Sequence, residues 1–67
     1  MSNNFNDLIK EAKEAQTRKT LKYIERLGRN RLEEVDHPNI SPKIRKSAKK
    51  DFSKLLKTIH SRSKAVN

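Results

Sequence analysis

Both prolines of the chain lie in one short segment, DHPNISP, at residues 36 to 42. A proline disfavours helix at the residue before it, so His37 and Ser41 are expected to be non-helical. By contrast, residues 5 to 27 contain neither proline nor glycine and are rich in residues that favour helix. The sequence therefore predicts a connector at residues 36–41 between helical segments.

The apolar residues before this connector change face along the chain. One group shares a side of the helical wheel: Phe5, Leu8, Ile9, Ala12 and Ala15. A second group shares a different side: Leu21, Ile24, Leu27, Leu32 and Val35. The shift predicts two helices, at about residues 5–16 and 18–35, with Thr17 and Thr20 as candidate caps between them. One long helix that offers different faces to different neighbours is the alternative.

Gly28 is the only glycine, and it falls inside the second predicted helix. Glycine in a helix interior costs about 1 kcal/mol relative to alanine, so its presence needs a reason. It is either a helix end or a small residue at a close contact between helices. Leu32 and Val35 continue the apolar face beyond it, which favours the close contact.

The third predicted helix begins with the segment ISPK. Ser41 is placed to cap the helix with its hydroxyl, and Pro42 suits the first helical position, where its missing N–H leaves no bond unmade. One arc of this helix is apolar: Ile44, Ala48, Phe52, Leu55, Leu56 and Ile59. The helix is expected to run to about His60, with residues 61–67 frayed.

These segments predict an all-α fold, a small three-helix domain over residues 1–67. A chain of 67 residues with 17 apolar side chains larger than alanine has a thin core. It has no cysteine, so disulfides and thiolate zinc sites are excluded as supports. Self-association is the main remaining support, and we expect a homodimer.

Charge is distributed unevenly along the chain. Residues 1–17 hold two basic and three acidic side chains, a net of −1, while residues 18–67 hold 15 basic and five acidic, a net of +10. A regional excess favours a binding surface for a polyanion over a general role in solubility. Disorder is the competing explanation of high charge, but the apolar periodicity argues against it.

Five lysines of the third predicted helix recur every three or four residues, roughly opposite its apolar arc: Lys43, Lys46, Lys50, Lys54 and Lys57. Arg45 and Lys49 lie on the shoulder of that arc. Each like-charged neighbour pair destabilises an isolated helix by about 0.2–0.5 kcal/mol, and only Asp51 is present to compensate. A row of phosphates would relieve this repulsion and release counterions, which predicts binding to nucleic acid. A solvated lysine-rich face is the alternative.

The middle predicted helix carries a second basic series: Arg18, Lys22, Arg26 and Arg29. Single-strand binders usually offer stacked aromatic side chains. Here the aromatic residues are Phe5 and Phe52, both in apolar arcs and expected in the core, and Tyr23, which lies off its stripe. This composition favours duplex DNA slightly over RNA or single strands.

No catalytic or metal-binding arrangement is expected. His37 and His60 are far apart in sequence, and the serines have simpler roles as caps or surface residues. Glu33, Glu34, Asp36 and His37 form a cluster whose spacing matches no known calcium or zinc motif. We therefore expect a non-enzymatic protein without a cofactor.

The leading hypothesis is a small basic protein that binds nucleic acid through phosphates. The alternatives are a helical interaction module, an inhibitor or adaptor that docks on an acidic protein partner, and an amphipathic protein on a membrane surface. No stretch is long and apolar enough for a membrane span, and the first ten residues lack the core of a signal peptide. We expect a cytoplasmic protein, associated with the nucleoid if it binds DNA; its size and composition are typical of accessory proteins of phages, plasmids and bacteria.

Overall fold

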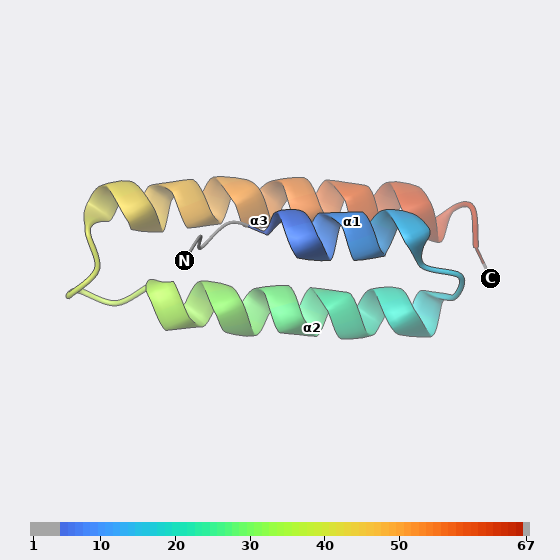
Figure 1. Ribbon diagram of the computed structural model, residues 1–67, viewed down its shortest axis with the longest axis horizontal. Coiled ribbons are helices and arrows are strands. Elements are labelled where there is room, and N and C mark those ends of the chain that lie inside the picture. Colours follow the sequence, from blue (N-terminus) through green and yellow to red (C-terminus); the bar gives the residue numbers. More distant parts are fainter. Residues whose placement is uncertain (1–4, 67) are drawn as a thin grey trace.

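The computed structural model describes residues 5–66, and in that range it contains three helices and no strand (Figure 1). The first helix, α1, spans Asn6–Glu14, α2 spans Arg18–Val35, and α3 spans Pro42–Ser63. The predicted all-α, three-helix fold is therefore confirmed. Met1 to Asn4 and Asn67, which belong to the predicted domain, lie outside the described residues.

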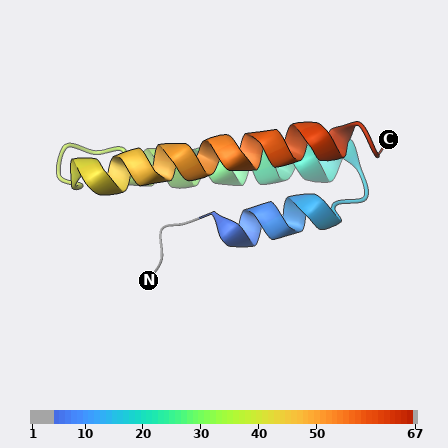
Figure 2. The ribbon, with the colours of Figure 1, turned by 90° about the horizontal axis from the view of Figure 1, so that it is seen from above.

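α2 and α3 run antiparallel along each other, and the shorter α1 packs on one face of this pair (Figures 1 and 2). The molecule is elongated, with extents of 40 × 18 × 14 Å. α1 covers only part of the length of the pair. The connector that contains both prolines joins α2 to α3 at the end far from the C-terminus.

The break between α1 and α2 follows the change of apolar face. α1 ends at Glu14, two residues before the predicted end, because the backbone at Ala15 is already extended, with ψ of 138°. Thr17 then caps α2, its hydroxyl accepting a hydrogen bond from the Thr20 N–H at 3.2 Å. The two-helix prediction for this region is confirmed, and the single long helix is wrong.

The core gathers apolar side chains from all three helices. Its buried members are Phe5, Leu8, Ala12, Ala15, Leu21, Ile24, Val35, Ala48, Leu55 and Ile59. Four of them are large and almost fully enclosed: Phe5, Leu21, Ile24 and Leu55. The ring of Phe5 also contacts the ring of Phe52, with centroids 6.0 Å apart. Phe5, the residue directly before α1, therefore completes the core together with Leu8 and Ala12 of α1.

Gly28 lies in the interior of α2, where a side chain would have no room. A β-carbon at this position would lie 2.6 Å from Cδ2 of Leu55 and 3.2 Å from Cε1 of Phe52. No residue in the range 5–66 has a positive φ angle, so the glycine is not needed for its backbone conformation. It permits the close approach of α2 and α3, as predicted.

α3 begins as expected and ends later than expected. Ser41 caps it, its hydroxyl accepting from the Lys43 N–H at 3.3 Å. The prediction of an end near His60 and a frayed tail is wrong, because helix continues to Ser63. The reason is a long-range contact: the Arg62 side chain donates from Nε to the carbonyl oxygen of Ala15 at 2.9 Å. Val66 also packs against the core.

The apolar arc of α3 is only partly covered. Ala48, Leu55 and Ile59 of this arc are buried, but Ile44 is 43% exposed. α1 begins beside Phe52, as the Phe5 ring contact shows, so the first turns of α3 lie beyond it. Membership of the predicted apolar arc therefore does not by itself bury Ile44.

Candidate polyanion-binding surface

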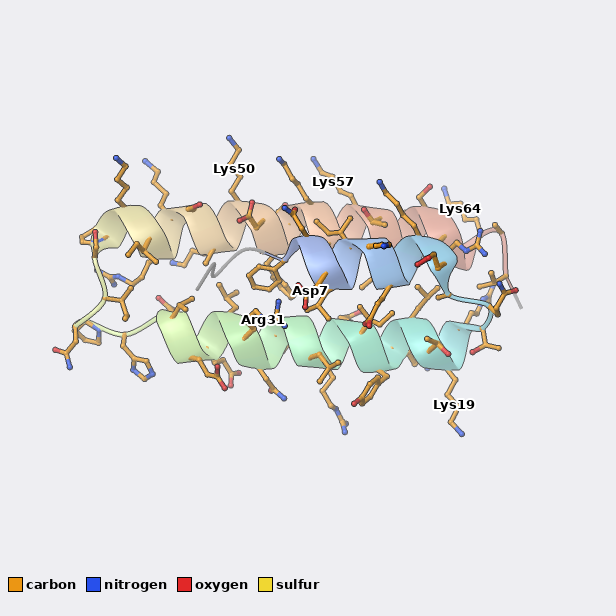
Figure 3. All side chains as sticks on the ribbon, viewed as in Figure 1. Asp7, Lys19, Arg31, Lys50, Lys57 and Lys64 are labelled. Carbon is orange, nitrogen blue, oxygen red and sulfur yellow. The ribbon has the colours of Figure 1, made fainter. Side chains whose placement is uncertain are left out.

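One side of α3 carries the lysine row, which we define as Lys43, Lys46, Lys50, Lys54 and Lys57. α3 directs Ala48, Leu55 and Ile59 into the core, so the row lies on the opposite side of the helix. Every member of the row is exposed. Figure 3 shows Lys50 and Lys57 pointing away from α2.

The charges of the lysine row are not neutralised within the described part of the chain. None of its five ammonium groups lies in an ion pair among residues 5–66. The one α3 cation near a carboxylate is Lys49, whose Nζ lies 4.0 Å from Oδ1 of Asp36, at the outer limit of such a pair. Repulsion along the row therefore persists in the folded protein, and an external anion would relieve it.

The α2 basic set consists of Arg18, Lys22, Arg26 and Arg29, all exposed. Two of its members also have structural contacts. Nε of Arg18 donates to the carbonyl oxygen of Ser63 at 3.3 Å, and Arg29 pairs with Glu25 one turn earlier at 3.1 Å. Lys22 and Arg26 make no such contact within residues 5–66, so they are the freest cations of the set.

Arg45 is less available than its neighbours in α3. It is partly buried, and its Nε is buried without a hydrogen-bond partner among the described residues. A guanidinium held in this way has less freedom to reach a phosphate than the exposed lysines. Among the residues predicted to bind, Arg45 is therefore the least accessible.

A groove between α2 and α3 brings part of the α2 basic set beside the end of α3. It measures about 420 Å³ and is lined by Arg18, Leu21, Lys22, Glu25, Leu56, Ile59, His60 and Ser63. Its cations are Arg18 and Lys22, and its apolar lining comes from Leu21, Leu56 and Ile59. The carboxylate of Glu25 is occupied by Arg29.

A second groove lies between α1 and α3, and we call it the α1–α3 groove. It measures about 460 Å³ and is lined by Lys13, Lys57, Thr58, Ser61, Arg62 and Ala65. Three of these side chains are cationic and none is acidic. Lys57 thus joins the lysine row to a site built partly from α1.

The structure places the two predicted basic series on different helices, the lysine row on α3 and the α2 basic set on α2. What it does bring together is Arg18 with Lys22 in one groove, and Lys57 with two unpredicted cations, Lys13 and Arg62, in the other.

Sequence patterns alone do not identify two cationic residues of the α1–α3 groove, Lys13 and Arg62. Lys13 lies in the segment whose net charge is negative, so a regional charge count hides it. Its position next to the apolar residue Ala12 is the signal that it borders the helix contact. Arg62 lies in the tail that was expected to fray, and its contact with Ala15 has no local signal.

One strong ion pair belongs to the fold instead of to this surface. The guanidinium of Arg31 donates two hydrogen bonds to the carboxylate of Asp7, at 2.7 and 3.1 Å. These bonds, with the positive charge of Arg31, lower the pKa of Asp7 below its usual value of 3.8, although partial burial opposes the shift. Arg31 also lies over the Phe5 ring, 5.6 Å from its centroid. The pair fastens α1 to α2.

Other kinds of site find little support. Within residues 5–66, no three acidic or histidine side chains converge on a position suited to a metal ion. None of the three helices is apolar over a length that would span a bilayer. Comparison of the chain with models of known protein families finds no match, and comparisons with curated proteins and with solved structures find none either. The function proposed below therefore rests on the charges and contacts of the basic surface.

Proposed function

We propose that the protein binds nucleic acid, chiefly through phosphates, with duplex DNA favoured slightly over RNA and single strands. The observation that carries this proposal is the lysine row, five exposed cations on one helix with no carboxylate partner in the described chain. The row costs helix stability in the free protein and gains favourable contacts only when an anion is present. The α2 basic set and the two grooves add further cations to the surface of the protein.

The length of the row suits a nucleic-acid backbone. Lys43 and Lys57 are 14 positions apart, which is about 21 Å along a helix. A strand of duplex DNA presents a phosphate about every 3.4 Å along the axis, so a row of this length runs beside about six phosphates. Five lysines over that distance can contact several of them.

The preference for a duplex rests on the aromatic residues. Phe5 is fully buried, and Phe52 is packed against the core, so neither is free to stack on a base. Among residues 5–66 the one exposed aromatic side chain is Tyr23, at 61%. A binding mode that relies on stacked bases has little to work with here.

The proposal includes a homodimer. It is supported by the small core and by the exposure of Ile44 on the face of α3 that α1 leaves uncovered. Sedimentation at micromolar concentration is expected to show twice the chain mass of 7.8 kDa, with melting that depends on concentration. A species of single-chain mass and constant melting temperature would rule the dimer out.

A gel-shift panel tests the function. It compares duplex DNA, single-stranded DNA and structured RNA of equal length at two salt concentrations. The expected result is binding to all three that weakens steeply with salt and is tightest for the duplex. If none of them binds at low salt, the proposal fails, and an acidic protein partner becomes the better explanation of the same cations.

A further inference from the structure

We propose that the α1–α3 groove is a phosphate-binding site, suited to a phosphate monoester such as the terminal phosphate of a nucleic acid. The inference deepens the proposed function and rests on it for the source of the phosphate. It concerns residues that lie mostly outside the lysine row: Lys13, Ser61 and Arg62.

The charge of the α1–α3 groove favours a phosphate ligand. Its lining holds the cations of Lys13, Lys57 and Arg62 and no carboxylate. Within residues 5–66, none of these three side chains is in an ion pair. A local charge of +3 is balanced better by a phosphate monoester, which carries about −1.5 to −2 near neutral pH, than by a diester with a single charge.

The guanidinium of Arg62 is held in place by a hydrogen bond to the backbone. Its Nε donates to the carbonyl oxygen of Ala15 at 2.9 Å in a partly buried setting, so the guanidinium is tied to the end of α1. Its two terminal nitrogens have no recorded partner among the described residues, and they can donate together to one phosphate. Less side-chain freedom is lost on binding because one bond already orients the group.

The hydroxyl groups and the volume of the groove are also suited to a phosphate monoester. Thr58 already donates its hydroxyl hydrogen to the carbonyl oxygen of Lys54 at 3.0 Å, so it forms a wall and does not donate to a ligand. The Ser61 hydroxyl makes no recorded contact in the described chain and is free to donate. The volume of about 460 Å³ leaves room for a sugar attached to the phosphate and lies within the range of about 300–1,000 Å³ that is usual for small-ligand sites.

The experiment has two arms. In the first, inorganic phosphate is titrated into the full chain, and backbone amide signals are followed by NMR. Saturable shifts are expected at Lys13, Ser61 and Arg62, with little change at Lys43, which lies at the far end of α3. In the second, duplexes that differ only in a 5′-phosphate or a 5′-hydroxyl are compared at one ionic strength. The phosphorylated duplex is expected to bind about tenfold tighter, which corresponds to one charge-assisted hydrogen bond.

A matched pair of variants locates the effect. Lys13→Gln should abolish the preference for the phosphorylated duplex and weaken the response to inorganic phosphate. A further variant, Ser61→Ala, should have the same two effects. Lys10→Gln removes the same charge from the same helix but lies outside the groove, so it should leave both unchanged. All three positions are exposed on helices, so folding should be retained.

The outcomes separate the site from the proposed function. Duplexes that bind equally well, together with no local response to phosphate, would overturn the site and leave nucleic-acid binding intact. A local phosphate response without duplex binding would support the site, assign it to free phosphate monoesters, and overturn the proposed function. A local response with equal binding of the two duplexes would likewise support a site for free monoesters.

Discussion

The two ends of the molecule differ in how many helices build them. In the three-helix half, α1 packs on α2 and α3, and Phe5, Leu21 and Leu55 are almost fully enclosed. In the two-helix half, beyond the contacts of Phe5 with Phe52 and of Asp7 with Arg31, α2 and α3 pair alone. There Ile44 is 43% exposed, although it continues the same apolar arc as Leu55. An amphipathic face is buried only as far as a neighbour covers it.

The lysine row crosses both halves. Lys43, Lys46 and Lys50 lie in the two-helix half, where the core is thinner, and Lys54 and Lys57 follow Phe52 in the three-helix half. Any anion that binds the row adds its binding free energy to the folded state. The two-helix half, which has fewer buried contacts, should gain most local protection from such binding.

The largest expected contrast between the halves comes from truncating their apolar residues. Leu55→Ala removes a side chain that is 0% exposed and should destabilise the protein by about 2–5 kcal/mol. Ile44→Ala, in the same helix, should cost at most about 1 kcal/mol because much of that side chain already meets water. Chemical denaturation of both variants measures the difference. Equal losses would mean that the two halves are equally well packed.

The sign of the stability change caused by Gly28→Ala tests how closely α2 and α3 pack. In an open helix, replacing glycine by alanine stabilises by about 1 kcal/mol. At Gly28 the new methyl group would meet Leu55, and overpacking costs about 1–3 kcal/mol, so the net expectation is a loss of up to about 2 kcal/mol. Asn30→Ala, at an exposed position of α2, serves as the control and should stabilise slightly. A clear gain in stability for Gly28→Ala would show that α2 and α3 are not in close contact there.

Removing a helix cap from each half should cause smaller losses of stability, which can be compared between the halves. Ser41→Ala should cost about 0.5–2 kcal/mol because the Lys43 N–H loses its acceptor. The loss should appear first as faster amide exchange in the opening turns of α3, where the core is thinnest. Thr17→Ala removes the corresponding cap from α2 in the three-helix half and should cost a similar amount without that local exchange. If the Ser41 variant melts at the parent temperature, the cap contributes nothing.

The smallest expected effect concerns the ion pair at the boundary between the halves. Because Arg31 lowers the pKa of Asp7 in the folded state, the pair stabilises the protein above about pH 4 and ceases to do so as pH falls through the lowered pKa. Asp7 is well exposed, so Asp7→Asn should cost no more than about 1 kcal/mol at pH 7. Its deficit relative to the parent should shrink below pH 4. Glu14→Gln, also in α1, should show no such trend, and a deficit that is constant with pH would exclude the pair as its cause.

The local features of the fold could be predicted because their signals are local. The connector, the Ser41 cap and the break at Thr17 follow from proline positions and from a change of apolar face within a few residues. The end of α3 could not be predicted, because the Arg62 contact joins residues 47 positions apart. Periodicity correctly placed Ile44 in an arc, but it carries no information on whether α1 reaches that arc.

The candidate surface was predictable to the same extent. Helical spacing was enough to place the lysine row opposite the core, since the row and the apolar arc share one helix. The α1–α3 groove needs two helices in contact, so its cations, Lys13 and Arg62, had no common signal in the sequence. Positions within one helix are set by the helix, whereas sites between helices depend on packing.

The salt dependence of duplex binding tests the proposed role of the lysine row most directly. With about five to eight phosphates contacted, log affinity should fall with log salt at a slope of roughly −4.5 to −7. Replacing Lys46, Lys50 and Lys54 together by glutamine should flatten the slope by about two to three units and leave helicity intact or improved, because repulsion along the row is relieved. A control that replaces Lys10, Lys19 and Lys64 removes the same charge outside the row and should change the slope less. A triple row variant with the affinity and slope of the parent would contradict the account and make the row a solvated face.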